Sequence, residues 1–386
     1  MLKRDIGLAQ SESVEYGYLF QMVFLAVTAV FLVGQMYTFV PLQGELSAHF
    51  GVSTASAALA TTVFSFSYAA GLFILGVLSD KYGALPLMRL GMLGSMVCSV
   101  LLIFSDSYAS FLTLRGLIGF VTSAFPPAAL GYAMRSMPER YKGLTVGFIS
   151  SGFLVAAIFG QATGQYFISH GGPERFFLFQ SVSFGALLLL SFITGLKNEI
   201  AGGKKLISKA VFSGKLMHLY FTALTLLFLF VSVFILLSVH SADILGSIGL
   251  TVSKLRLITL PLLFFPIVAS FFIGKYGSER VLMVGLGLLM LGCAVFISAS
   301  GAGQTVTAAI LAIGGTSVVI PSIITTIGKY AGESKGTAVS IYALLLFIGA
   351  GLAPVAAGFF SSGQGLAVML TAVSFTALIS AYRGSR

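Results

Sequence analysis

Arg115 is the residue whose type and position most clearly suggest chemistry. It lies in a run of mostly apolar residues, Tyr108 to Met134, that contains no Asp or Glu. An ionisable side chain at membrane depth is costly, so it usually faces a water-filled cavity or a polar partner. Its planar donors match a carboxylate or phosphate in a bidentate way, and no acidic residue stands in the middle of any long apolar run. The sequence therefore predicts a site for a small anionic or zwitterionic compound, such as a carboxylate metabolite or chelator.

Other polar side chains that a cavity could use are scattered over several apolar runs. The candidates for substrate contact, besides Arg115, are Gln35, Tyr37, Gln161, Gln165, Tyr342, Lys254 and Arg256. The last two stand near the start of a predicted helix, where basic side chains usually reach for the membrane interface. For Arg115 the alternative is a structural role, with hydrogen bonds to carbonyl groups or to glutamines of the neighbouring fifth helix.

The apolar runs indicate an all-α integral membrane protein. Of the 386 residues, 57% are hydrophobic and 9% are charged, whereas soluble domains have roughly 25% charged residues. A spanning helix needs about 20 mostly apolar residues. Twelve spans are predicted, at residues 18–42, 55–77, 86–105, 108–134, 143–168, 176–196, 216–239, 251–273, 281–299, 305–328, 336–360 and 365–382. We expect an N-terminal six-helix bundle at 1–196, a linker at 197–215 and a C-terminal six-helix bundle at 216–386.

The distribution of basic residues predicts the orientation in the membrane. Of the 22 Lys and Arg residues, 18 lie at the two termini, in the predicted linker or in alternate connections between spans. Cytoplasmic loops carry such an excess, so both termini and the linker are predicted to be cytoplasmic in a multi-pass protein of the inner membrane. Topology and anionic lipid explain the formal net charge of +10, and no nucleic-acid partner is expected.

The chain repeats itself with an offset of about 194 residues. The segment Asp80 to Gly83 is echoed by the segment Gly274 to Gly277, 194 positions later. Cys98 is likewise followed by Cys293 at an offset of 195. Two six-helix halves of the same orientation, with a site at their interface, are typical of secondary transporters.

The repeated loop has the composition of a conformational lock. Its residues are Gly76, Asp80, Lys81, Gly83 and Arg89. A carboxylate at the end of the second span can accept hydrogen bonds from a helix N-terminus and pair with Arg89, and Gly83 permits a tight turn. The alternative is ordinary loop chemistry on the cytoplasmic side. Because Gly274 replaces the acid in the second copy, we expect the lock to be stronger in the first half.

These residues resemble the signature between helices 2 and 3 of the major facilitator superfamily, Gly-x-x-x-Asp-Arg/Lys-x-Gly. The resemblance implies two pseudo-symmetric six-helix bundles and alternating access around a midplane cavity. Arg115 and Gly119 resemble the helix 4 signature of the drug:proton antiporter branch. Gly160 and Gly164 resemble its helix 5 motif only in part, since Gln161 stands where that motif has proline. Close helix packing is the alternative explanation for these two glycines.

No reaction chemistry is indicated by the sequence. Cys98 and Cys293 lie in separate spans without metal-ligand spacing, and no Gly-Lys pair has the context of a nucleotide-binding loop. We therefore expect no enzyme activity, no cofactor and no metal site.

The expected function is a proton-driven exporter of the small compound described above, monomeric in membrane lipid. The alternatives are a broad-specificity multidrug:proton antiporter in which Arg115 is structural, an uptake symporter, a lipid-flipping protein, and a receptor or scaffold. The short loops argue against the last of these.

Overall fold

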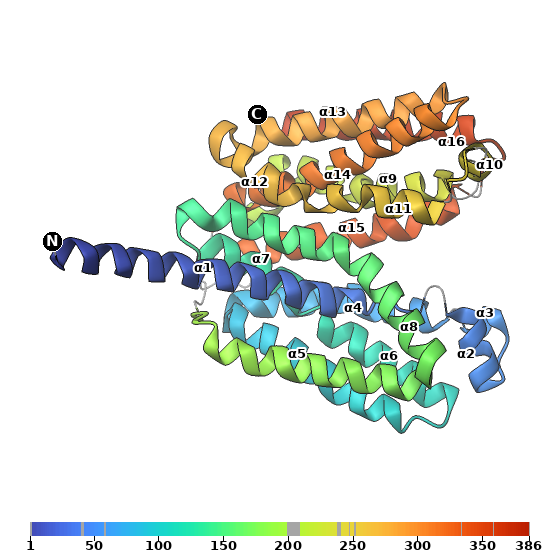
Figure 1. Cartoon of the computed structure of the whole chain (residues 1–386). Coiled ribbons are helices and arrows are strands. Elements are labelled where there is room, and N and C mark those ends of the chain that lie inside the picture. The colour runs from blue at the N-terminus through green and yellow to red at the C-terminus, as the bar shows by residue number, and fades with distance from the viewer. Residues whose placement is uncertain are drawn as a thin grey trace. The chain divides into compact units, whose positions relative to one another are not determined.

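The fold of the chain is almost entirely helical (Figure 1). The computed structural model describes residues 2–39, 42–57, 59–198, 209–237, 241–246, 248–250, 252–332, 334–357 and 359–385. The chain divides into two compact units, Met1–Gly202 and Gly203–Arg386. We call them unit 1 and unit 2 and describe each by itself.

Unit 1 is built from long helices that pack side by side. Its helices are α1 (Leu2–Gly34), α2 (Gln43–Phe50), α3 (Thr54–Ala57), α4 (Leu59–Tyr82), α5 (Ala84–Ile103), α6 (Tyr108–Thr122), α7 (Phe125–Arg135) and α8 (Glu139–Ile193). Helix α8 is kinked at Gly172, where φ is +81°, and Pro173 follows. Two apolar stretches of α8, Glu139–Ile168 and His170–Ile193, are each long enough to cross a membrane, and the kink lies in the first turn of the second stretch.

Unit 2 has the same kind of helical architecture. Its elements are the 3-10 helix η1 (Lys209–Phe212), α9 (Gly214–Ile235), α10 (Ala242–Gly246), α11 (Val252–Thr259), the 3-10 helix η3 (Leu260–Phe264), α12 (Phe265–Tyr276), α13 (Ser278–Ile297), α14 (Ala302–Tyr330), α15 (Lys335–Ala357) and α16 (Gly363–Ser385). Helix α13 packs against α14 and α16, and α9 packs against α15 and α16.

The predicted all-α membrane fold is confirmed, with differences in two spans. Ten helical stretches of the described chain are long and apolar enough to cross a membrane, and two shorter apolar stretches are Leu260–Tyr276, formed by η3 and α12, and Thr337–Ala350 within α15. The eighth predicted span, 251–273, is not one helix but the succession α11, η3 and α12. Pro261 and Pro266 explain the interruption, because proline removes a hydrogen-bond donor and its ring clashes with the preceding turn. The first span also ends early, since α1 stops at Gly34 and residues 35–39 form turns.

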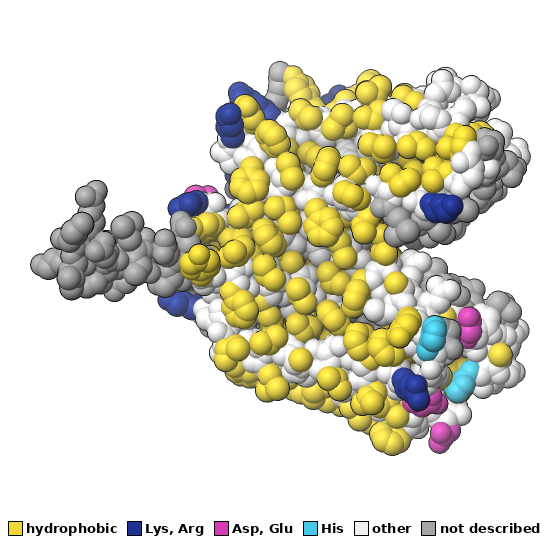
Figure 2. Space-filling view, in the orientation of Figure 1, with side chains coloured by type: hydrophobic (Ala, Val, Ile, Leu, Met, Phe, Trp, Pro, Cys, Tyr) yellow, Lys and Arg dark blue, Asp and Glu magenta, His cyan; other side chains and the backbone are white. Residues whose placement is uncertain are grey.

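Apolar side chains remain exposed along the flanks of both units. Leu189 and Phe271, for example, are 71% and 65% exposed, and Figure 2 shows hydrophobic side chains over much of the visible flank of each unit. A soluble protein rarely leaves contiguous apolar surface of this extent. These flanks are therefore the lipid-facing surfaces of a multi-pass membrane protein.

The repeated turn has the same backbone conformation in both units. Gly83 and Gly277 have φ values of +91° and +87°, a region that glycine enters without steric cost. In both units a lysine and a tyrosine precede the glycine. The Lys81 ammonium lies 5.0 Å from the ring centroid of Tyr82, and the Lys275 ammonium lies 5.2 Å from that of Tyr276. The predicted turn glycine is thus confirmed in both copies of the repeat.

Each unit also contains helix crossings that only glycine permits. A β-carbon at Gly160 of α8 would overlap the carbonyl oxygen of Gly34 at the end of α1. In unit 2 a β-carbon at Gly349 of α15 would overlap the carbonyl oxygen of Leu224 on α9. Small residues let membrane helices approach to backbone contact. The predicted close packing at Gly160 and Gly164 is present, since a β-carbon at Gly164 would lie 2.7 Å from Thr38 Cγ2.

Replacing Gly160 with leucine should destabilise unit 1 because the α1–α8 crossing cannot accept a side chain. Overpacking of this kind costs roughly 1–3 kcal/mol, which corresponds to an apparent melting temperature about 2–10 °C lower. The measurement is the fraction of purified protein that stays monodisperse after heating. Gly287→Leu is the matched control, because a β-carbon there meets nothing within 4 Å. Equal melting temperatures for the two variants would contradict the crossing.

Candidate functional site

A buried polar cluster in unit 1 joins Arg115, Gln35 and Gln180. Arg115 lies on α6, Gln35 is the first residue after α1, and Gln180 lies on the second part of α8. The side chains are 1%, 1% and 6% exposed. Arg115 Nη2 donates to the Gln35 carbonyl oxygen at 3.0 Å, and Nη1 lies 3.5 Å from Gln35 Oε1. Gln180 Nε2 donates to the same Oε1 at 3.0 Å.

The end of α1 explains why the guanidinium binds at this point. The last carbonyl groups of a helix lack intrahelical partners and need another donor when they are buried. Here the chain leaves α1 through turns in which Met36 N donates to Val33 O at 3.1 Å and Tyr37 N to Gly34 O at 3.0 Å. Arg115 supplies a donor to the next carbonyl group, that of Gln35. The cation also suits the negative end of the helix dipole.

Two phenylalanine rings enclose the guanidinium. Arg115 Cζ lies 4.8 Å from the ring centroid of Phe39 and 4.5 Å from that of Phe64. Phe39 belongs to the turns after α1 and Phe64 to α4, and they are 2% and 0% exposed. A cation over a desolvated ring gains up to about 2 kcal/mol. Arg115 therefore ties α6 to α4 and to the end of α1.

The cluster keeps unused hydrogen-bonding capacity. Arg115 Nε, Gln35 Nε2 and Gln180 Oε1 are buried and have no hydrogen-bond partner in the described part of the chain. Nor does Arg115 form an ion pair with any described carboxylate. Gln35 and Gln180 line a slot of only ≈ 10 Å³, about the volume that one water needs. The cluster is therefore closed in this structure and holds a cation whose described hydrogen-bond acceptors are neutral.

The structure brings together only some of the predicted substrate contacts. Tyr37 and Gln161 are half-buried, and Gln165 is exposed on α8. Tyr342 is 3% exposed on α15, and its hydroxyl has no hydrogen-bond partner among the described residues. Lys254 is exposed on α11 and donates to Gly249 O at 3.3 Å, and the Arg256 side chain lies outside the described part of the chain. Of the eight predicted residues, Arg115 and Gln35 are in direct contact.

Gln180 is the member of the cluster that the sequence reasoning missed. It lies inside the predicted span 176–196 and is an amide in an apolar run, the same signal that identified Gln35. Sequence could not show that Gln180 reaches Gln35, because 145 positions separate them along the chain. Packing of α8 against α1 creates the contact.

The lock residue Asp80 has a different partner from the one predicted. Its Oδ1 atom lies 2.7 Å from Arg135 Nη1, and the side chains are 9% and 11% exposed. Arg89, the predicted partner, donates instead to the Ser191 hydroxyl at 3.1 Å and to the Ser191 carbonyl oxygen at 3.0 Å. Its Cζ lies 3.9 Å from the Phe192 ring centroid. Helix α5 packs chiefly against α8, and the Arg89 side chain caps the last turn of α8 instead of binding Asp80.

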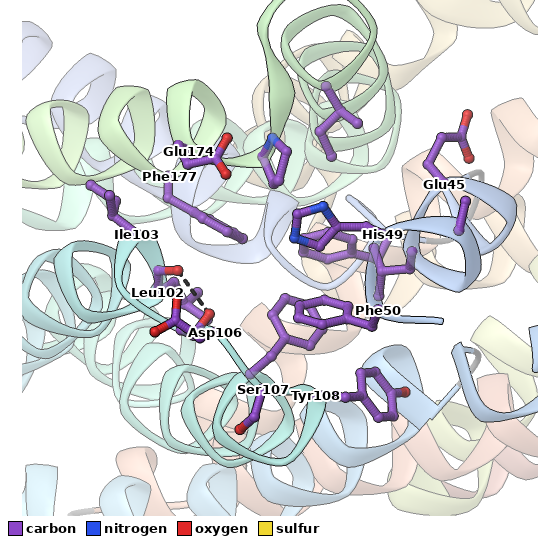
Figure 3. A pocket seen from close by; sticks show the side chains of 17 residues that line it. Glu45, His49, Phe50, Leu102, Ile103, Asp106, Ser107, Tyr108, Glu174 and Phe177 are labelled. Carbon is purple, nitrogen blue, oxygen red and sulfur yellow. Dashed lines mark hydrogen bonds between the residues drawn. The ribbon is translucent and has the colours of Figure 1, made fainter. Parts of the chain in front are cut away.

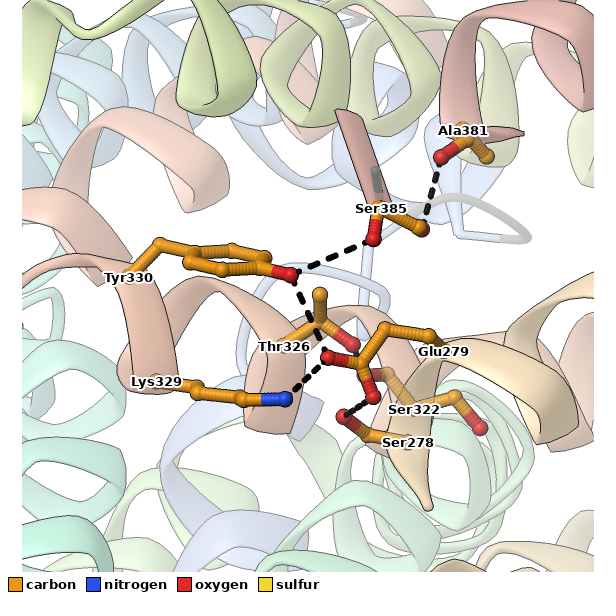
Figure 4. Close-up of polar contacts among 8 residues, drawn as sticks. All are labelled: Ser278, Glu279, Ser322, Thr326, Lys329, Tyr330, Ala381 and Ser385. Carbon is orange, nitrogen blue, oxygen red and sulfur yellow. Dashed lines mark hydrogen bonds and ion pairs between the residues drawn. The ribbon is translucent and has the colours of Figure 1, made fainter. Parts of the chain in front are cut away.

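Unit 2 contains an ion pair at the equivalent place. Lys329 Nζ binds Glu279 Oε1, and the Tyr330 hydroxyl donates to the same oxygen at 3.3 Å (Figure 4). Lys329 follows Arg135 at the repeat offset of 194, whereas Gly274 occupies the position of Asp80. The acid in unit 2 comes from the first turn of α13 rather than from the end of α12. The sequence did not predict this pair, because its carboxylate stands after the turn, at Glu279, whereas Asp80 stands before the turn in unit 1. Only the basic residue occupies the equivalent position in both units.

The family of the chain follows from comparison with known proteins. Residues 23–354 match the family model described as Major Facilitator Superfamily. The chain belongs to this superfamily of membrane transporters, and it is not an enzyme.

Two of the curated relatives bear the names of drug resistance proteins. The chain is 28% identical over 145 residues to the uncharacterized MFS-type transporter YybF of Bacillus subtilis, covering 36% of each chain. It is 24% identical over 233 residues to the multidrug resistance protein MdtG of Klebsiella pneumoniae, covering 57% of this chain and 56% of the relative. It is 24% identical over 269 residues to the tetracycline resistance protein, class H, of Pasteurella multocida, covering 65% and 64%. The match with YybF thus spans about a third of that relative's length.

Solved transporters share the fold at low sequence identity. The Escherichia coli fucose:proton symporter FucP (N162A) aligns with a TM-score of 0.75 at 14% identity, covering 96% of this chain and 99% of that one. The human organic anion transporter MFSD10 (TETRAN) aligns with a TM-score of 0.74 at 16% identity, covering 94% and 98%. Similarity at this level establishes the major facilitator fold.

The Asp80–Arg135 pair should show energetic coupling that the Asp80–Arg89 combination lacks. Because the pair is largely buried, the double variant Asp80→Asn/Arg135→Gln should be more stable than additivity predicts, by about 1–3 kcal/mol. The free energy of unfolding in a denaturant titration of each single and double variant measures this coupling. Asp80→Asn combined with Arg89→Gln is the control and should be additive within roughly 0.5 kcal/mol. Coupling confined to the control combination would refute the assignment.

Proposed function

We propose that the chain is a proton-driven exporter of a small anionic or zwitterionic compound that works by alternating access. The observation that carries the proposal is the Arg115 guanidinium, which is 1% exposed and has no described carboxylate partner. A buried charge normally has a counter-ion, because an isolated one is expensive. A carboxylate ligand would provide that counter-ion and would accept from the unused Nε.

The direction of transport is inferred from the relatives and from the helix 4 and helix 5 residues. Two of the relatives described above bear the names of drug resistance proteins, and such resistance is consistent with export. The mechanism of alternating access is inferred from membership of the superfamily. We place the protein in the inner membrane with both termini in the cytoplasm and propose the domain division 1–196, 197–215 and 216–386.

Access to Arg115 requires movement within unit 1. The guanidinium is covered by Phe39 and Phe64 and held by the Gln35 carbonyl group. Gln35 and Phe39 both lie in the turns after α1, outside the regular helix. A shift of these turns would expose the guanidinium without unwinding α6. The proposed substrate therefore binds in a conformation other than the closed one described here.

A broad-specificity multidrug:proton antiporter is the second candidate function. The observation that favours it is the same enclosure, because a guanidinium held by a backbone carbonyl group and two rings is a satisfactory structural tie between α1, α4 and α6. In this case Arg115 would position α1 and would not contact the substrate. The two candidates differ in the ligand charge that they accept and in their dependence on the Arg115 charge.

Transport in everted membrane vesicles with an imposed pH gradient distinguishes the candidates. Wild-type protein should accumulate carboxylated ligands in preference to cationic ligands of the same size. Arg115→Gln should lower the initial rate at least tenfold, since a hydrogen bond to a charged group contributes about 1.5–3 kcal/mol. Arg115→Lys, which keeps the charge, should retain part of the rate. Measuring initial uptake rates for both ligand sets in all three proteins completes the test.

Three outcomes would speak against the proposal. Transport of the cationic set alone, unchanged in Arg115→Gln, would identify the multidrug antiporter. Movement of ligand and protons in the same direction would identify an uptake symporter. If both Arg115→Gln and Arg115→Lys lose folded protein, and if the transport rate falls in proportion to that loss, Arg115 has a structural role.

A further inference from the structure

Unit 1 contains a second and much larger cavity, which we call the α2 pocket. Its volume is ≈ 770 Å³, within the range of about 300–1,000 Å³ that is typical of small-molecule sites. Its lining comes from α2, from the turn between α5 and α6, from the start of α6 and from the kink of α8 (Figure 3). Figure 2 shows carboxylates and histidines, with a basic side chain beside them, at the end of unit 1 where α2 lies. Asp80 stands near the end of α4, next to the start of α5, whereas the pocket is lined by the turn that follows the end of α5. The α2 pocket and the Asp80–Arg135 pair therefore lie at opposite ends of α5.

One wall of the α2 pocket is aromatic. The rings of Phe50 and Phe111 lie 5.1 Å apart, those of Phe50 and Tyr108 5.4 Å, and those of Phe39 and Phe111 5.5 Å at an interplanar angle of 85°. All of these residues, and Phe177, line the pocket. Phe50 and Tyr108 are only half-buried, so they remain accessible from the pocket. Aromatic faces carry partial negative charge and attract cations.

The charged groups of the α2 pocket are acidic. Glu45 of α2, Asp106 of the α5–α6 turn and Glu174 beside the α8 kink all line it, and each is exposed. None of the three forms an ion pair with a residue that the structure describes. The described lining includes no Lys or Arg, and His49 is its one other titratable side chain apart from Tyr108. Carboxylates from three separate elements therefore give the cavity a negative field.

We propose that the α2 pocket binds a lipophilic organic cation. Carboxylates at its edge match the positive charge, and the aromatic wall matches an apolar body and adds cation–π attraction. An anion of the same shape meets the same wall but is repelled by Glu45, Asp106 and Glu174. This inference concerns a site separate from the Arg115 cluster and does not rest on the proposed export function.

The α2 pocket and the Arg115 cluster share one ring. Phe39 lines the pocket and also lies 4.8 Å from Arg115 Cζ. Phe111, which contacts Phe39, stands one helical turn before Arg115 on α6. A cation in the pocket would therefore compete with the guanidinium for the π-electrons of Phe39. Ligand binding in the α2 pocket would therefore change the contact between Phe39 and Arg115 that helps to close the cluster.

Binding of tetraphenylphosphonium and tetraphenylborate to purified full-length protein in nanodiscs tests the proposal. The two ions have nearly the same shape and opposite charge, so they separate charge recognition from apolar partitioning. Equilibrium dialysis, corrected with empty nanodiscs, should show saturable binding of the phosphonium alone. The triple variant Glu45→Gln/Asp106→Asn/Glu174→Gln should raise its Kd roughly tenfold, because each exposed carboxylate contributes modestly. Phe50→Leu should raise it about threefold.

Glu139→Gln is the matched control, since it removes an exposed carboxylate at the start of α8, away from the pocket lining. It should leave the Kd unchanged. All three carboxylates of the triple variant are exposed, so the protein should fold normally. An unchanged phosphonium Kd in the triple variant, or equal saturable binding of the borate, would overturn the proposal. Loss of phosphonium binding in Arg115→Gln but not in the triple variant would overturn it as well, by moving the site to the buried cluster.

Discussion

The arrangement of unit 1 depends on one hydrogen bond, from the Arg115 guanidinium to the carbonyl oxygen of Gln35 at the point where α1 ends. A helix that stops inside an apolar bundle leaves carbonyl groups that water cannot reach. Arg115 satisfies the carbonyl group of Gln35, while Phe39 and Phe64 shield the charge that does so. A neutral donor could make the same bond, but it would bring no charge to the centre of the unit. Arg115 thus both satisfies a buried carbonyl group and supplies the charge that we propose binds an anion.

The cluster can form only because α1 and α8 approach each other to backbone contact. Gly160 lets α8 touch α1 at Gly34, directly before Gln35, and the second part of α8 carries Gln180 to the same place. Unit 2 repeats the device at Gly349 without repeating the cation, because the position equivalent to Arg115 in the repeat belongs to an uncharged stretch of α14. The two units therefore share their packing and differ in the chemistry that they carry.

The ion pairs show how far local sequence reasoning reaches. The turn glycines and the acidic residue before the turn follow from residue type and spacing, and Gly83 and Gly277 have the positive φ that the pattern requires. The partner of Asp80 does not follow, because Arg89 and Arg135 are both basic residues on the predicted cytoplasmic side. Arg135 comes within 2.7 Å, whereas the Arg89 side chain is held by Ser191 of α8, and only the packing of the helices decides between the two. The same argument applies to Glu279, whose pairing with Lys329 spans 50 positions.

By itself the sequence determined the membrane class, the repeat, the family and the isolation of Arg115 from acidic residues, since each of these depends on composition or on spacing along the chain. It also indicated Gln35 as a polar residue at depth. Only the tertiary structure decided that Arg115 is enclosed by Gln35 and two phenylalanine rings, that Gln180 completes the cluster, and that Glu45, Asp106 and Glu174 surround one aromatic cavity. Those contacts join residues from different helices. Packing between helices, which no local pattern records, brings them together.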